Sequence, residues 1–131
     1  MTVQWGVMST ARINGAFLEG VARSETCRVA AVASRDAARA REYAREHGID
    51  RAHGSYEALL ADDEVEAVYV SLPNALHLKW ATRALQAGKH VLCEKPLSRR
   101  AAYVETAFDA ARDADRLLME AFMYRHHPQT R

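Results

Sequence analysis

The stretch VQWGVMSTARIN, residues 3–14, begins as an apolar run and ends in small and polar residues. Residues 3–8 contain β-branched and aromatic side chains, a composition typical of a strand that is buried on both faces. The following residues, 12–23, carry apolar side chains at helical spacing. This part of the chain therefore predicts a strand, a turn and a helix, in that order.

The same alternation of strands and helices continues along the chain. Helices of this length between buried strands indicate parallel βαβ units with right-handed crossovers, and hence a doubly wound α/β sheet. Residues 49–54 are expected to contain a weak additional strand. Gly48 is expected to end the second helix, and Ser55 and Ser98 are expected to cap the N-termini of two others. The predicted strands are 3–8, 28–33, 65–72, 90–93 and 117–123, and the predicted helices are 12–23, 36–47, 55–61, 73–86 and 98–114.

Length and composition indicate one ordinary globular domain. The chain has 131 residues, of which 49% are hydrophobic and 27% charged, and its formal net charge is +1. Such a balance argues against nucleic acid or an anionic membrane as the main partner. No apolar run is long enough for a membrane span and no signal-peptide pattern is present, so a cytoplasmic location is expected. The six histidines show no metal-ligand spacing, and no metal site is predicted.

The turn after the first strand lies where a dinucleotide-binding fold carries G-x-G-x-x-G. Here Ser9, Ala11 and Asn14 stand at the three glycine positions. Alanine is small enough to let a pyrophosphate approach the backbone, and the helix N-terminus offers free N–H groups. A plain strand-to-helix turn is an equal alternative on this motif alone.

The end of the second strand predicts a preference for NADP over NAD. Ser34 stands where an NAD site usually has an acidic residue for the ribose 2′-hydroxyl. Arg35 and Arg39 offer guanidinium groups that suit a 2′-phosphate, which a carboxylate would repel. Asp36 fits the start of the following helix, where it interacts with the helix dipole. The alternative is that Ser34 only caps this helix and both arginines are solvated.

Two further strand ends carry polar residues. The predicted strand 65–72 ends in SLPNALH, in which Pro73 fixes the turn, Asn74 caps the helix and His77 is expected to face the ligand crevice. A purely structural histidine is the alternative.

The predicted strand 90–93 is followed by Glu94, Lys95 and Pro96. Proline disfavours helical geometry at the preceding residue, which keeps the ammonium of Lys95 near the crevice. A lysine at this place can stabilise developing alkoxide charge during hydride transfer, with Glu94 neutralising or orienting it. A surface ion pair between the two residues is the alternative.

Four motifs together resemble the N-terminal domain of the Gfo/Idh/MocA oxidoreductases, the family of glucose-fructose oxidoreductase, inositol dehydrogenase and dimeric dihydrodiol dehydrogenase. The motifs are WGVMSTARI, SLPNALH, EKP and MEAFMYRHHPQ, and they span nearly the whole chain in the expected order. The chain departs from the common pattern at Ser9 and Ala11, where most members have glycine. This departure concerns cofactor affinity more than the fold.

The resemblance implies a Rossmann domain over residues 1–125, with residues 126–131 beginning the connection to a second α/β domain. It implies NADP, or NAD, as cofactor, and Lys95 as the catalytic lysine that contacts nicotinamide and the reacting hydroxyl. The cofactor-binding residues predicted from the strand ends and the resemblance are Ser9, Thr10, Ala11, Arg12, Ile13, Ser34, Arg35, Arg39, Leu72, Pro73, Asn74, His77, Glu94, Lys95 and Arg125.

The resemblance also implies an enzyme, an oxidoreductase acting on the CH–OH group of a sugar, cyclitol or dihydrodiol or on the corresponding ketone. The family's second domain supplies the remaining acid/base and the substrate pocket and usually forms the dimer interface. Without it, we expect the chain to lack full turnover, and the full-length form to be a homo-oligomer. A non-catalytic dinucleotide-binding module or sensor is the alternative. A methyltransferase is disfavoured, because Ser34 replaces the acid that would bind the ribose hydroxyls.

Overall fold

A computed structural model describes residues 1–130 as a six-stranded sheet with helices on both faces. The elements alternate along the chain, as the sequence predicts. They are β1 Val3–Met8, α1 Asn14–Ala22, β2 Cys27–Ala33, α2 Ala37–His47, β3 Arg51–His53, α3 Tyr56–Leu60, β4 Ala67–Val70, η1 Asn74–Leu76, α4 His77–Gln86, β5 His90–Cys93, α5 Ala101–Asp113, β6 Leu118–Glu120 and η2 Met123–His126.

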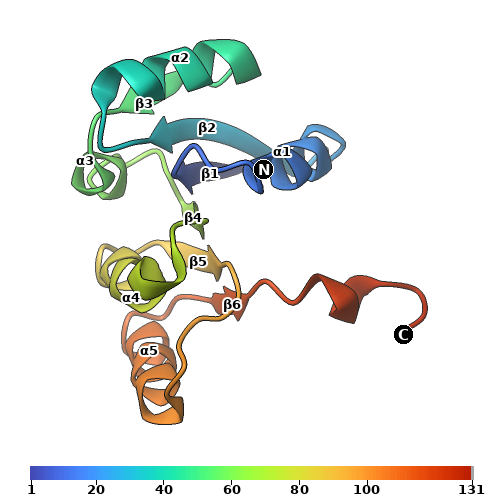
Figure 1. The fold of residues 1–131 in the computed structure, drawn as a ribbon, viewed down its shortest axis with the longest axis vertical. Helices are drawn as coiled ribbons and strands as arrows, with labels where there is room; N and C mark the ends of the chain where they lie inside the picture. Colours follow the sequence, from blue (N-terminus) through green and yellow to red (C-terminus); the bar gives the residue numbers. More distant parts are fainter. Residues whose placement is uncertain (131) are drawn as a thin grey trace.

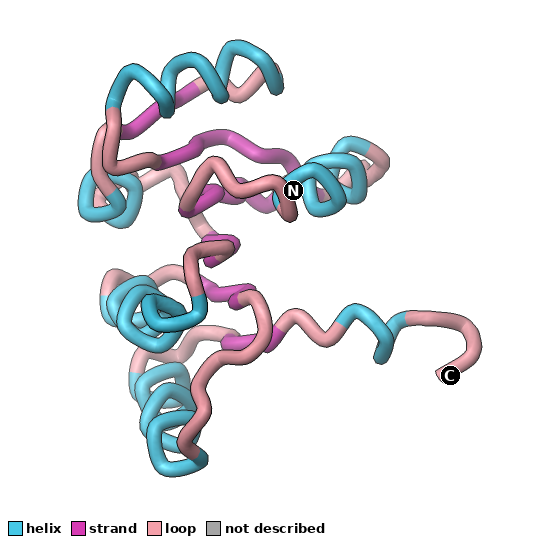
Figure 2. Tube along the Cα trace, viewed as in Figure 1, coloured by secondary structure: helices cyan, strands magenta, loops and turns pink. Residues whose placement is uncertain are grey.

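All strand pairs are parallel, and the strand order is β3-β2-β1-β4-β5-β6. The chain therefore moves outward in one direction from β1 to β3, then returns to the centre and moves outward the other way from β4 to β6. Figure 1 shows α3, α4 and α5 along one side of the sheet and α1 on the other, and Figure 2 shows the strands as a twisted stack between them. The predicted doubly wound parallel sheet is confirmed. Strand order reverses between β1 and β4, which is where such sheets bind ligands.

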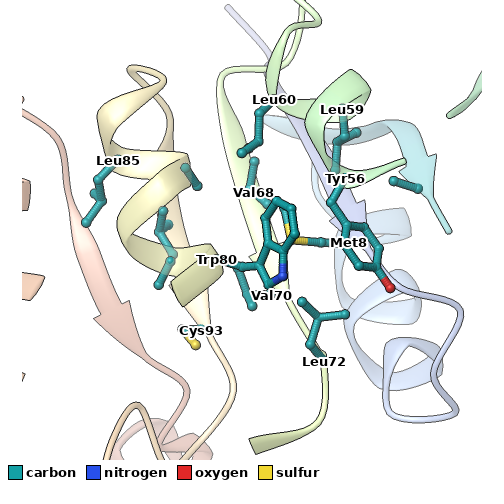
Figure 3. Close-up of a cluster of buried hydrophobic side chains, with 14 of the residues drawn as sticks. Met8, Tyr56, Leu59, Leu60, Val68, Val70, Leu72, Trp80, Leu85 and Cys93 are labelled. Atoms are coloured by element: carbon teal, nitrogen blue, oxygen red, sulfur yellow. The ribbon is translucent and has the colours of Figure 1, made fainter. Parts of the chain in front are cut away.

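Each face of the sheet has its own hydrophobic cluster. On one face, side chains of β1 and β4 meet the inner sides of α3, α4 and α5, with Trp80 edge-on to Tyr56 at 5.0 Å between ring centroids. Figure 3 shows this cluster around Met8, Val68 and Trp80. The other face is covered by α1 and α2, where Phe17 stacks on Tyr69 at 4.3 Å. Strands buried on both faces explain the continuous apolar runs of the sequence.

The element boundaries confirm the predicted roles of Gly48 and Ser55. Asn74 does not cap α4: it begins η1, and the cap position of α4 is Leu76, whose side chain makes no capping hydrogen bond. Gly48 ends α2 with a left-handed φ of 64°, and Ser55 caps α3 by accepting a hydrogen bond from the Ala58 backbone. The weak strand expected within 49–54 exists as β3. Ser98, however, does not cap α5: the cap position is Arg100, whose side chain makes no capping hydrogen bond, and the Ser98 hydroxyl accepts instead from the Arg100 backbone.

The face of β4, β5 and β6 on the α1 side is left partly open. An apolar hollow of about 290 Å³ lies there, lined mainly by aromatic and aliphatic side chains that include Phe17, Leu92 and Met119. The segment after β6 extends away from the sheet (Figure 1). Within residues 1–130, no helix combines the length and apolar character needed to cross a lipid bilayer.

Candidate functional site

Strand register places the predicted site residues in one row. The last residues of four neighbouring strands are direct partners: Ala33 with Met8, Met8 with Val70, and Val70 with Cys93. In each strand the next residue leaves the sheet at the same edge. The row that follows therefore contains Ser34, Ser9, Ser71 and Glu94.

Ser9 belongs to a closed ring of hydrogen bonds at the centre of this row. Its hydroxyl lies 2.7 Å from the Ser71 hydroxyl and accepts from the Ala11 backbone at 3.1 Å. Ser71 donates to the Asn14 amide oxygen at 2.5 Å, and the Asn14 amide nitrogen donates back to the Ser9 carbonyl at 3.0 Å. Ser9, Ser71 and Asn14 are buried. Two of the substituted glycine positions thus join the first turn to the end of β4, and the Ser9 side chain faces inward.

The first turn also shows why glycine is common at position 9. Ser9 has a φ of 138°. This conformation favours glycine, because glycine has no Cβ atom to clash with the backbone. The ring of hydrogen bonds holds the serine there. The same turn leaves the backbone N–H groups of Arg12 and Ile13 without an acceptor among the described residues. Free N–H groups at the start of α1 fit a pyrophosphate.

The end of β2 carries two arginines without partners. Arg35 and Arg39 are exposed, and within residues 1–130 neither side chain makes an ion pair or a hydrogen bond. Asp36 caps α2, because its carboxylate accepts from the Ala38 and Arg39 backbones at 2.8 and 3.2 Å. The alternative in which Ser34 caps α2 is therefore wrong. Ser34 accepts from the Asp36 backbone at 3.3 Å.

The end of β4 places Pro73 and Asn74 at the surface and His77 in the interior. Pro73 and Asn74 are exposed, whereas His77 is 1% exposed. The His77 ring lies between two backbone carbonyls, with Nδ1 2.8 Å from Pro96 O and Nε2 2.6 Å from Leu72 O. The expectation that His77 faces the crevice is wrong, because both ring nitrogens are turned to internal acceptors.

Glu94 has a different partner from the one expected. Its carboxylate accepts a 2.6 Å hydrogen bond from the Tyr69 hydroxyl and forms no ion pair with Lys95. Successive residues at a strand end point to opposite sides of the sheet, which separates Glu94 from Lys95. Glu94 lines the apolar hollow instead. Burial and the adjacent Glu94 carboxylate raise the pKa of Tyr69, so the phenol stays protonated and donates.

Lys95 is exposed at this edge, directly before a cis peptide bond to Pro96. Its ammonium contacts no carboxylate or other acceptor within residues 1–130. The surface ion pair considered as an alternative is therefore wrong. Arg125 lies on η2, beyond β6, and is also exposed. The structure brings Arg125 into no hydrogen bond with the strand ends.

Three residues of this edge were missed by sequence reasoning. Ser71 completes the ring with Ser9, Tyr69 holds Glu94, and Glu120 of β6 accepts from the Leu97 backbone at 2.8 Å. Ser71 and Tyr69 lie in an apolar strand and resemble core residues. Glu120 alone carried a signal, since it is the one charged residue within the predicted strand 117–123.

Comparisons with known proteins agree with this architecture. Residues 3–122 match the model of the GFO_IDH_MocA oxidoreductase family, described as an NAD-binding Rossmann fold. D-xylose 1-dehydrogenase (NADP(+)) 2 of Haloferax volcanii is 49% identical over 98% of this chain and 39% of its own length. Trans-1,2-dihydrobenzene-1,2-diol dehydrogenase of Xenopus laevis is 39% identical, again over 98% of this chain and 39% of its own.

A solved structure shows the same fold. KijD10, a 3-ketoreductase from Actinomadura kijaniata, was crystallised in complex with NADP; it matches with a TM-score of 0.93 and 42% identity over 98% of this chain and 41% of its own. The chain thus spans about 40% of the length of these proteins. By its family model and its fold, the chain belongs to the Gfo/Idh/MocA oxidoreductases, whose NAD-binding Rossmann fold covers residues 3–122.

Proposed function

We propose that this chain is the NADP-binding part of an oxidoreductase that transfers hydride between nicotinamide and a secondary alcohol or ketone of a sugar, cyclitol or dihydrodiol. The observation that carries the proposal is a row of strand ends and following turns with unpaired cations, among them Arg35, Lys95 and, in the first turn of α2, Arg39. One relative of matching sequence is named an NADP(+) D-xylose dehydrogenase and another a dihydrodiol dehydrogenase, and the ketoreductase KijD10 was crystallised with NADP. Homo-oligomerisation of a longer form and a cytoplasmic location stay predictions.

The residues present fit the cofactor. The free N–H groups at the start of α1 suit the pyrophosphate, and Arg35 with Arg39 suits the 2′-phosphate through charge-assisted hydrogen bonds. When bound, NADP supplies the hydride acceptor or donor. The Lys95 ammonium can donate a hydrogen bond to the reacting oxygen and so stabilise alkoxide charge. Pro73, Asn74 and Ile13 are exposed at the same edge of the sheet, which is where the nicotinamide is expected.

Cofactor preference tests the arginine part of the proposal. The chain is titrated with NADPH and with NADH, and binding is followed by nicotinamide fluorescence. NADPH should bind at least about tenfold more tightly, because NADH lacks the 2′-phosphate and so loses a charge-assisted hydrogen bond worth about 1.5–3 kcal/mol. The double variant Arg35→Ala/Arg39→Ala should lose this preference and keep its NADH affinity. Arg45→Ala, which removes an exposed arginine from the far end of α2, is the matched control. Equal affinities in the wild type, or tighter NADH, contradict the proposal.

Turnover tests the role of Lys95. In a form of the protein as long as its relatives, Lys95→Met should abolish hydride transfer while weakening NADPH binding by no more than about tenfold. A non-catalytic dinucleotide-binding module would show no transfer in the wild type either, with any of the three substrate classes. Full turnover by Lys95→Met would exclude Lys95 as the catalytic lysine.

A further inference from the structure

The loop that carries Lys95 is held almost entirely by residues other than Lys95. Glu94 N–H donates to Val70 O at 2.9 Å before it, and Leu97 N–H donates to Glu120 after it. Lys95 itself makes no backbone or side-chain hydrogen bond within residues 1–130. Between these two anchors, the Pro96 carbonyl oxygen lies 2.8 Å from Nδ1 of the buried His77 ring.

The geometry points to His77 as a positioning residue that fixes the Lys95 ammonium by holding the Pro96 carbonyl. The consequence for catalysis by Lys95 rests on the proposed function, whereas the contact between His77 and Pro96 does not. His77 begins α4, and its ring joins the end of β4, through Leu72 O, to the loop after β5. The two strand ends that flank the expected nicotinamide position therefore contact the same side chain. Precise placement of a catalytic group requires contacts of this kind.

The two ring contacts have different consequences. The Nδ1 contact to Pro96 acts on the Lys95 loop, whereas the Nε2 contact to Leu72 acts on the turn before α4. A neutral imidazole carries one N–H and can form only one of these bonds as donor, while the imidazolium forms both. His77 is 1% exposed, so the ring itself is shielded from water. Loss of the Nδ1 contact would remove the donor that the ring offers to the half-buried Pro96 carbonyl.

Two amide replacements separate these contacts. The amide nitrogen of asparagine is bonded to Cγ, as Nδ1 is, and that of glutamine occupies the position of Nε2. His77→Asn should therefore keep the donor to Pro96, and His77→Gln should keep only the donor to Leu72. Both variants lose the ring, so any general effect of the smaller side chain on packing is shared between them. Thermal unfolding of each variant confirms that the fold is retained.

Hydrogen exchange tests the contact without any cofactor. The Leu97 amide, next to Pro96, should exchange about tenfold faster in His77→Gln than in the wild type, because loss of one hydrogen bond worth about 1.4 kcal/mol favours local opening. In His77→Asn it should stay within about threefold of the wild type. Equal acceleration in both variants would overturn the inference.

A double-mutant cycle tests whether His77 acts through Lys95. His77→Gln should weaken NADPH binding by about three- to tenfold, and the double variant His77→Gln/Lys95→Met should bind no more weakly than Lys95→Met alone. Additive losses would show that His77 supports the site in some way other than through Lys95, and would overturn the inference. If the wild type binds no NADPH at all, the proposed function fails, but the exchange experiment still decides the contact.

Discussion

At the scale of single residues, Ser9 shows how the chain replaces a glycine. Its φ of 138° lies in a region that costs a residue with a Cβ about 1–2 kcal/mol, and its hydroxyl offsets this by joining the Ser71 and Asn14 ring. The backbone cost and the hydroxyl contribution therefore oppose each other at one position. Substitutions that change one without the other can separate them.

We predict that Ser9→Ala is less stable than Ser9→Gly. Both variants lose the hydroxyl, at a cost of about 1–2 kcal/mol, because the Ser71 hydroxyl and the Ala11 N–H lose a partner. Only the glycine variant also relieves the strained φ, which should return about 1 kcal/mol. Urea unfolding measures the difference in unfolding free energy. If Ser9→Gly proved equal to or less stable than Ser9→Ala, position 9 would not be strained.

At the scale of elements, the helix N-termini show which caps the local sequence decides and which it does not. Asp36 and Ser55 cap α2 and α3 with their own side chains, as residues of these types do. In α5 the cap position falls on Arg100, because the Pro96–Ser98 segment is held by its neighbours and the helix starts later than Ser98 would allow. α5 therefore begins without a side-chain cap and without an acidic residue in its first turn.

We predict that Arg100→Asp stabilises the fold by about 0.5–1 kcal/mol. The carboxylate can accept from the free N–H groups of α5 and interacts favourably with the helix dipole, where a guanidinium does not. The gain is reduced by loss of the Arg100 contact with Tyr103. Thermal and urea unfolding at low salt provide the measurement. Arg99→Asp, one residue before the cap and also exposed, is the control and should change stability by less than half as much.

At the scale of the whole molecule, burial of the sheet makes stability depend on pH at alkaline values. Cys93 ends β5 and is fully buried, and burial raises the pKa of its thiol from the ordinary 9.0 to about 12. Below pH 9 the thiol is protonated in both the folded and the unfolded chain, so it has no effect on the pH dependence. Above pH 9 the unfolded chain releases this proton first.

We therefore expect the unfolding free energy to fall as pH rises above 9, by up to about 1.4 kcal/mol per pH unit from Cys93. Between pH 9 and 10, Cys93→Ala should show a shallower slope than the wild type, although it is less stable throughout because of the cavity it leaves. Tyr69 adds to the loss in both proteins above pH 10, since its pKa is raised as well. Urea unfolding at pH 7, 9, 9.5 and 10 measures the slopes, and parallel slopes would contradict the prediction.

The two-sided fold follows from the sequence to a large extent. Apolar runs without alternation indicate strands buried on both faces, and most of the connecting helices, with 9–13 residues, are long enough for parallel crossovers. The C-terminal strand is the weakest part: expected over 117–123, it covers Leu118–Glu120 and continues into η2. At an edge strand, only one neighbour supplies backbone hydrogen bonds, so apolar sequence alone does not fix its length.

The sequence by itself determined the alternation of elements, the parallel sheet and the edge at which polar side chains gather, because hydrophobic periodicity and turn residues act locally. Only the tertiary structure decided the partners of those side chains. Glu94 pairs with Tyr69 and not with its neighbour Lys95, and His77 turns inward to Leu72 and Pro96. Such choices depend on strand register and on which buried carbonyl needs a donor, and both are set by contacts between residues far apart in the chain.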